Sequence, residues 1–236
     1  MPTIFTLLIA LALGLLVNYL ADTLPRTRRL TRPDWWPPAA TSLRAYLARP
    51  RVWLTMLTAI ALAMGLSKVP FTGWPGWQLA LILSYCALVV VIDIEHRAVL
   101  HEVSIAGVVL FGVIGWLRRG ALETLLGGVG GFAILLALYW LGELLGRWLA
   151  RRRGEPWDEV ALGFGDVNLA GVLGLLLGWP AIIGALMLAT LFGGLFSLAY
   201  ILNALSRGRY SAFAAIPYAP FLVLGALTLI LLRAFV

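Results

Sequence analysis

The chain is short of charged residues and of cysteine. Only 12% of its 236 residues are charged, whereas 61% are hydrophobic. Soluble domains carry roughly twice that share of charge, which excludes an ordinary soluble fold. The single cysteine, Cys86, lies in an apolar run. A disulfide within the chain and a cysteine-based zinc site are therefore both excluded.

Acidic residues are also scarce, and the net charge is +7. Such a surplus can indicate nucleic-acid binding, but here the arginines lie in short connections between apolar blocks. We therefore expect the partner to be a lipid bilayer and not nucleic acid. The first block, Thr3–Ala21, lacks a basic segment before it, so we do not expect a removable signal peptide.

Long apolar blocks predict an all-α fold, a polytopic membrane helix bundle of about eight transmembrane helices. We expect residues 1–236 to form a single integral membrane domain. The eight blocks are Thr3–Ala21, Val52–Leu66, Gly76–Ile94, Val103–Leu117, Thr124–Leu149, Val167–Trp179, Ala181–Leu205 and Tyr218–Phe235.

The basic residues predict the orientation. Fourteen of the 18 lie in the odd-numbered connections, and basic connections stay in the cytoplasm. Both termini are then outside, and the protein is a multi-pass protein of the cytoplasmic (inner) membrane. The largest connection, residues 22–51, is rich in Pro, Trp and Arg. We expect this cytoplasmic loop to lie on anionic headgroups, with a role in holding substrate as the alternative.

Two aspartates stand out because a carboxylate at membrane depth is costly. Asp93 ends the third block and Asp166 begins the sixth. The third helix runs inward and the sixth outward, so both aspartates are expected at the cytoplasmic side. The other acidic residues need no special role: Asp22 is assigned to the first loop, and Glu143 is expected to pair with Arg147 four residues on.

Two close carboxylates share a proton, so one can act as a base towards water while the other donates a hydrogen bond to a carbonyl. Gly163 and Gly165 flank the second aspartate and would let a backbone approach closely. The alternative is that each aspartate is a helix-end residue solvated at the interface.

Three segments carry a family resemblance. Gly163–Asp166 (GFGD) resembles the GxGD signature of intramembrane aspartyl proteases, and its surroundings resemble the type IV prepilin peptidases. Val91–His96 looks like the context of that family's first aspartate, and Ala215–Phe221 looks like its closing motif. The likeness is densest over residues 84–226, which we take as a peptidase-like core.

The resemblance implies an aspartyl endopeptidase with its active site at the cytoplasmic membrane face. It would remove basic leader peptides from pilin-like precursors, its protein partners. Asp93 and Asp166 would be the catalytic carboxylates. The residues implied to bind substrate or shape the site are Gly163, Gly165, Asn168 and Pro217.

The sequence departs from the family in three places. Leu100–His101 stand where Pro-Asp is common, and Asn168 stands where lysine is common. The first loop lacks the two Cys-x-x-Cys pairs of members that also methylate their product. We therefore expect no metal and no cofactor, with S-adenosylmethionine needed only if methyl transfer is retained.

These departures leave other functions open. One is a catalytically silent paralogue acting as an assembly or scaffold component. Another is a GxGD protease with a different substrate. A third is a small ion- or proton-coupled transporter, in which the aspartates would bind the cation.

Overall fold

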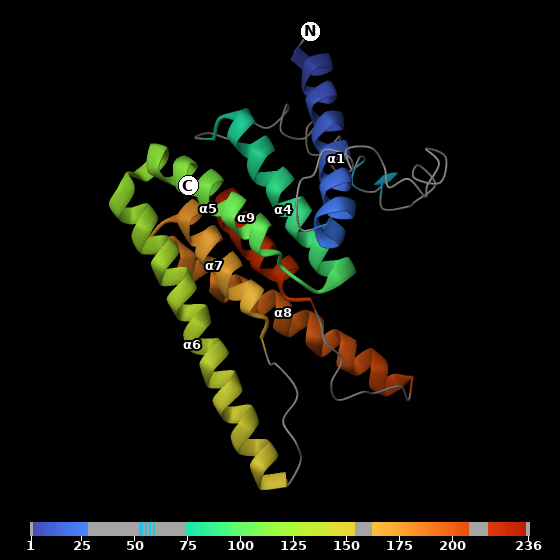
Figure 1. Cartoon of the computed structure of the whole chain (residues 1–236), viewed down its shortest axis with the longest axis vertical. Coiled ribbons are helices and arrows are strands. Elements are labelled where there is room, and N and C mark those ends of the chain that lie inside the picture. Colours follow the sequence, from blue (N-terminus) through green and yellow to red (C-terminus); the bar gives the residue numbers. More distant parts are fainter. Residues whose placement is uncertain are drawn as a thin grey trace. The chain divides into compact units, whose positions relative to one another are not determined.

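The structure is a computed structural model that describes residues 2–27, 52–53, 55, 57, 59, 74–153, 162–207 and 217–234. Every element in these residues is an α-helix, which confirms the all-α class. The helices are α1 (Pro2–Thr27), α4 (Gly76–His96), α5 (His101–Arg119), α6 (Ala121–Arg153), α7 (Phe164–Leu177), α8 (Ala181–Ser206) and α9 (Ala219–Ala234) (Figure 1).

Seven of the eight expected blocks correspond to these helices. Four of them, α4, α5, α6 and α8, are long and apolar enough to cross a membrane. α7, α9 and the segment Leu11–Pro25 of α1 form shorter apolar stretches. The second expected span, Val52–Leu66, lies mostly outside the described residues, and its five described positions are helical.

The end of α1 corrects one expectation. We expected a loop to begin at Asp22, but α1 continues to Thr27 and Asp22 is only 8% exposed. A hydropathy pattern stops at the first charged residue, whereas the buried face of the helix continues through Ala21 and Leu24. Pro25 falls in the last turn, where it has no N–H to bond to the carbonyl of Ala21, and the helix ends two residues later.

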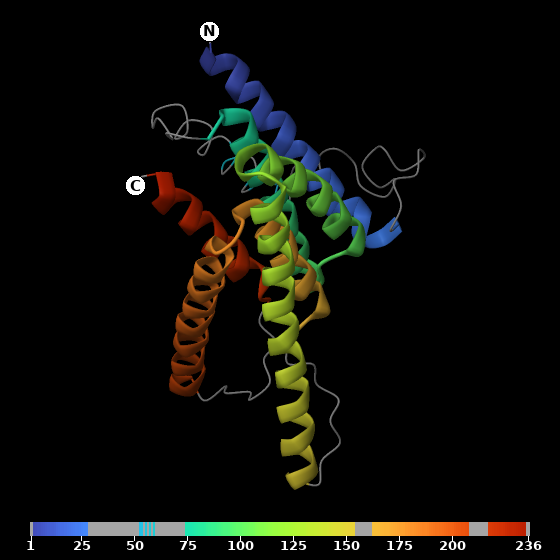
Figure 2. The same cartoon turned by 90° about the vertical axis from the view of Figure 1, so that its left-hand side faces the viewer.

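The chain forms two compact units, residues 1–96 and residues 97–234. In the first unit α1 and α4 pack together and run in the same direction (Figures 1 and 2). Asn18 is fully buried on α1. Its side-chain amide donates to the carbonyl of Gly14 at 2.9 Å and to the hydroxyl of Thr55. These bonds satisfy a polar group that would otherwise be costly to bury.

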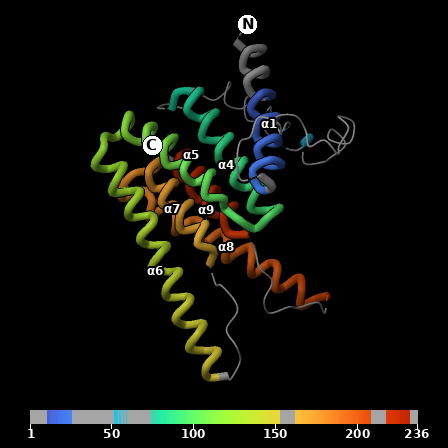
Figure 3. Tube along the Cα trace, viewed as in Figure 1, coloured from blue at the N-terminus to red at the C-terminus, as the bar shows by residue number. Residues whose placement is uncertain are grey.

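In the second unit, α5, α7 and α9 run in one direction, and α6 and α8 run in the other. Figure 3 shows this course of the chain from helix to helix. The helix α7 lies between its neighbours and contacts α5, α6, α8 and α9. Nine of its 14 residues are buried. It is therefore the central helix of this unit.

Close packing of α6 on α7 depends on glycine. A Cβ placed on Gly127 would collide with the carbonyl of Gly174, and one on Gly174 would collide with the carbonyl of Gly127. On the same face, a Cβ on Gly131 would collide with the carbonyl of Ala170. Small residues four apart let two membrane helices bring their backbones together, where lipid offers no hydrophobic drive for association.

Polar contacts fix the C-terminal end of α7. Gly178 ends the helix with φ 72°, and its N–H donates to the carbonyl of Gly174 at 2.8 Å. The Arg119 guanidinium donates to the carbonyl of Leu176 at 2.5 Å. The N–H of Trp179 donates to the carbonyl of Glu123 at 3.1 Å. The turn between α5 and α6 thus holds the turn between α7 and α8.

The glycine contact predicts a stability effect. Gly174→Ala should lower the free energy of unfolding by about 1–3 kcal/mol, because its methyl group meets backbone atoms that cannot rotate away. Thermal unfolding in detergent measures it. Gly194→Ala is the matched control, since nothing lies within 4 Å of a Cβ there. Equal melting temperatures for the two variants would contradict the close contact.

Candidate functional site

Asp166 lies in the first turn of α7 and is only 8% exposed. Its backbone N–H donates to the carbonyl of Gly163 at 3.0 Å. Its carboxylate turns back towards the start of the helix, because a Cβ on Gly163 would lie 3.1 Å from Asp166 Oδ2. A negative charge is favourable at a helix N-terminus. The fold therefore holds this carboxylate at the N-terminal end of α7, beside Gly163, which has no side chain.

The second glycine of the motif has a different neighbour. A Cβ on Gly165 would lie 2.8 Å from the Cβ of Val99, and 3.1 and 3.2 Å from its carbonyl oxygen and amide nitrogen. Val99 belongs to the short connection between α4 and α5. The missing side chain at Gly165 therefore lets this connection pack directly on the first turn of α7.

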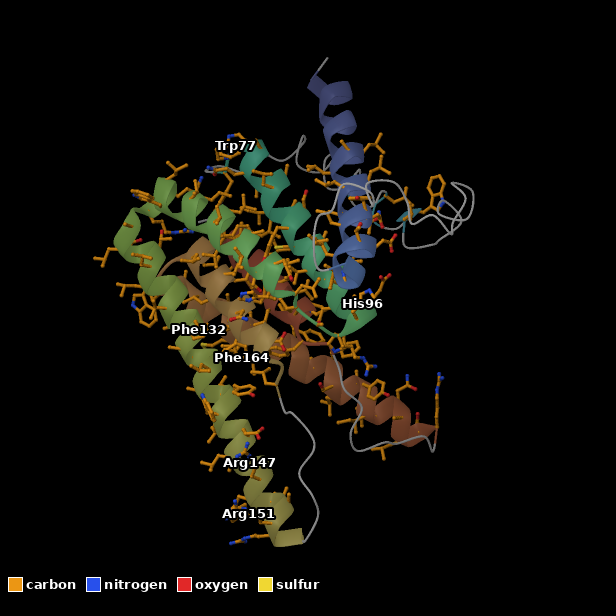
Figure 4. The ribbon with its side chains drawn as sticks, in the orientation of Figure 1. Trp77, His96, Phe132, Arg147, Arg151 and Phe164 are labelled. Atoms are coloured by element: carbon orange, nitrogen blue, oxygen red, sulfur yellow. The ribbon has the colours of Figure 1, made fainter. Side chains whose placement is uncertain are left out.

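The residue between the two glycines packs on α6. The ring of Phe164 lies edge-on to Phe132 and Tyr139, with ring centroids 6.4 and 6.0 Å apart. Figure 4 shows Phe132 and Phe164 side by side where α6 passes the start of α7. Even so, 52% of Phe164 stays exposed. The first turn of α7 is thus held by aromatic rings of α6 and by the backbone of Val99.

Asp93 lies in the last turn of α4 and is 5% exposed. Buried residues recur along α4 at helical spacing, and Ile92 and Asp93 end this buried face. Figure 4 labels the two ends of the helix, Trp77 and His96. This burial argues against the alternative in which Asp93 is a helix-end residue solvated at the interface. Its pairing with Asp166 stays a prediction.

Two further predicted site residues have clear positions. Asn168 lies one turn after Phe164, so the two share a face of α7, and it is partly buried. Pro217 precedes α9, whose first turn begins with hydrogen bonds to the carbonyl of Tyr218. There Tyr218 and Phe221 pack on Gly193 of α8. Their roles in substrate binding stay predictions.

The positions where the family motif is absent have local structural roles. Leu100 precedes α5, and its carbonyl accepts hydrogen bonds from the N–H and the hydroxyl of Ser104 at 3.0 and 3.2 Å. His101 is the first residue of α5.

The ion pair that was expected on α6 is confirmed, with Arg147 Nε 2.8 Å from Glu143 Oε1.

Sequence reasoning missed two features of the helices. It placed Asp22 in a loop, although spacing of four from Asn18 puts both on one helix face. It also gave Phe164 no role. Phe132 and Tyr139 are seven residues apart in an apolar helix, a spacing that places both rings on one face. That spacing could have indicated an aromatic partner, but not which one.

Metal ligands do not gather in the part of the chain that the structure describes. There, no three or more His, Cys, Asp or Glu side chains come together in a way that could hold a metal ion. The chemistry that the described site offers is that of carboxylates. A buried carboxylate can accept or donate a proton, depending on its protonation state.

The fold and the site together define a helical membrane protein that buries Asp22 and Asp93 in its first unit and Asp166 in its second. The sequence profile of the type IV leader peptidase family matches residues 79–198, which include both Asp93 and Asp166. The chain belongs to the type IV leader peptidase family.

Curated relatives agree with this membership. A prepilin leader peptidase/N-methyltransferase of Aeromonas salmonicida is 28% identical over 176 residues, which are 72% of this chain and 53% of that protein. The protein of the same name from Pectobacterium carotovorum is 27% identical over 187 residues, or 77% of this chain and 59% of its own. The chain thus spans little more than half the length of these relatives. No solved structure matches the chain.

The contact of Gly165 with Val99 gives a second testable effect. Gly165→Ala should lower the free energy of unfolding by about 1–3 kcal/mol, because its methyl group collides with Val99. Val99→Gly removes the nearest atom, so the double variant should recover part of that loss. Thermal unfolding of the two single variants and the double variant measures the coupling. Strictly additive losses would contradict direct contact.

Proposed function

We propose that this protein is an aspartyl endopeptidase that removes basic leader peptides from type IV pilin-like precursors. The observation that carries the proposal is a buried aspartate, Asp166, within a motif whose two glycines both have tight neighbours in the fold. The family match over residues 79–198 supports the same reaction. Asp93 is the second carboxylate of the proposal, because it is also buried and lies in the matched segment.

The proposed reaction needs both carboxylates at one peptide bond. One carboxylate takes a proton from a water molecule, which attacks the carbonyl carbon of the scissile bond. The other, protonated, donates a hydrogen bond to the carbonyl oxygen. The proton that was taken then passes to the leaving amine, so the pair ends with the number of protons it began with. Neither carboxylate becomes covalently attached to the substrate.

Gly163 and Gly165 support this chemistry because they bring no side chains to the N-terminal end of α7. Gly163 is exposed and brings no side chain between Asp166 and an incoming peptide. The helix α7 has 14 residues, so it is about 21 Å long and shorter than the ~30 Å hydrocarbon core. We infer that the first turn of α7 lies inside the membrane, near its cytoplasmic surface. The basic leader of a precursor would join the precursor's own apolar helix at this depth.

The proposal is limited to cleavage. The names of the relatives also include N-methyltransferase. Residues 22–51 of this chain contain no cysteine, so they lack the two Cys-x-x-Cys pairs of the family members that also methylate their product. S-adenosylmethionine would be required only if this chain also methylates its product. The arginine-rich segment 22–51 lies largely outside the described residues.

Cleavage by the purified chain tests the proposal. In detergent, the wild type should shorten a pilin-like precursor by its leader, whereas Asp93→Asn and Asp166→Asn should each reduce the rate at least about a thousandfold, since an amide cannot take the proton. Gel shift and mass spectrometry of the product measure it. Glu143→Gln is the control, because that carboxylate is paired with Arg147 on the same helix, α6.

Other results would identify the alternatives. A folded wild type that binds precursor without cleaving it would favour a scaffold component and contradict the proposal. Equal product from the wild type and both Asn variants would remove the aspartates from the mechanism. Ion flux in liposomes that requires both aspartates, without cleavage, would favour a transporter.

A further inference from the structure

The helix α6 continues well past the start of α7. Two contacts show how the helices are aligned: the N–H of Trp179 donates to the carbonyl of Glu123 at the far end of α7, and the ring of Tyr139 meets Phe164 at its start. After Tyr139, α6 continues for another 14 residues. Figures 1, 2 and 4 all show this part, residues 140–153, extending beyond α7. We refer to it as the α6 extension.

Large apolar side chains of the α6 extension are exposed. They are 43–66% exposed and recur at helical spacing: Trp140, Leu141, Leu144, Leu145, Trp148 and Leu149. Residues four apart share a face of a helix, so Leu144, Trp148 and Arg152 form one line along the extension. The last step of this line is seen directly, because the guanidinium carbon of Arg152 lies 3.8 Å from the centroid of the Trp148 ring.

The chemistry along this line changes from aliphatic to aromatic to cationic. Leucine is favourable among acyl chains, tryptophan gathers at the membrane–water interface, and arginine extends its charged group to the headgroups. A phospholipid presents three environments in the same order, namely its acyl chain, its glycerol backbone and its phosphate. The line therefore matches one lipid molecule lying along the helix.

The charge of the α6 extension favours an anionic headgroup. Arg151 and Arg152 follow each other at its end and are both exposed, and Figure 4 labels Arg151 there. The one acidic residue of the extension, Glu143, already forms an ion pair with Arg147 at 2.8 Å. It therefore does not neutralise the two arginines at the end. Guanidinium groups bind phosphate strongly, and each arginine near a membrane surface strengthens the attraction to anionic lipid.

The lengths of the two helices place these arginines among the headgroups. With the other end of α7 at the outer boundary, its ~21 Å leave about 9 Å of the ~30 Å hydrocarbon core on the cytoplasmic side of its first turn. The headgroup layer adds about 6 Å. Trp148 lies nine residues beyond Tyr139, or about 14 Å, which is within that layer. The Arg152 guanidinium is at the same level, because it lies on the Trp148 ring.

We propose that the α6 extension binds an anionic phospholipid of the cytoplasmic leaflet. Arg151 and Arg152 bind its phosphate, Trp148 lies beside its glycerol backbone, and an acyl chain follows the helix along Leu144. The bound lipid anchors the end of α6 at the membrane surface. Because α6 packs on the first turn of α7 through Phe164, the anchor also fixes the depth of that turn. The lipid site is a property of α6 and does not depend on whether the chain cleaves a precursor.

Native mass spectrometry of the purified full chain in detergent tests the site. Phosphatidylglycerol and phosphatidylcholine with identical acyl chains are the probes. The wild type should bind phosphatidylglycerol at least about tenfold more tightly, because it lacks the choline cation that the arginines repel. Arg152→Gln should weaken phosphatidylglycerol binding about fivefold, whereas Arg152→Lys keeps the charge and should lose less.

Arg207→Gln is the matched control. Arg207 is also an exposed arginine at the end of a long apolar helix, α8, but Asn203 precedes it by one turn in place of tryptophan. This variant removes the same charge and should change phosphatidylglycerol binding by less than about twofold. Equal binding of the two lipids by the wild type would overturn the site. Equal losses in Arg152→Gln and Arg207→Gln would overturn it too, because net charge alone would then explain the preference.

A spin label tests the depth of the α6 extension independently of charge. The label is placed on Leu145→Cys in a chain whose Cys86 is replaced by alanine. In bilayers of phosphatidylglycerol and phosphatidylcholine, it should collide more often with oxygen, which dissolves among acyl chains, than with a water-soluble nickel complex. A label that collides mainly with the nickel complex would contradict the proposal, since the extension would then stand in water, where a protein partner could cover it.

Discussion

The backbone contact between α6 and α7 is the constraint on which the second unit depends. Gly127 and Gly174 touch through their backbones, and a methyl group on either would collide with the other's carbonyl. Helices inside a membrane gain nothing from excluding water, so this close approach and its van der Waals contacts must supply the association. Because α6 is long and straight beside α7 (Figure 2), the contact also decides which residues of α6 lie next to the first turn of α7.

From that contact the arrangement of the GxGD segment follows. Three of its four residues have a close neighbour: Gly163 the Asp166 carboxylate, Phe164 the rings of α6, and Gly165 the residue Val99. Asp166 is left buried at the end of the helix. The motif therefore has a packing role as well as a chemical one. Within one helical turn it contacts the connection between α4 and α5, contacts helix α6 and carries a carboxylate.

The sequence predicted the helices well, because apolar length alone determines which segments can cross a bilayer. The pair of Glu143 with Arg147 also follows from a local rule, whereas α7 begins at Phe164, before the expected block that starts at Val167. The burial of Asp22 did not, because hydropathy ends a span at the first charge while the helix continues. The neighbours of Gly165 and Phe164 come from other segments, and no local pattern names them. A sequence pattern can show that a position needs glycine, but only the packed structure shows which neighbour requires it.

The proposed reaction requires Asp93 and Asp166 to act on one peptide bond, and therefore to lie close together in the membrane. Dipolar broadening between spin labels measures this most directly. The labels would be placed on Asp93→Cys and Asp166→Cys in a chain whose only native cysteine, Cys86, is replaced by alanine. In bilayers, we expect the spectrum of the doubly labelled chain to be much broader than the sum of the two singly labelled spectra. A spectrum equal to that sum would contradict it.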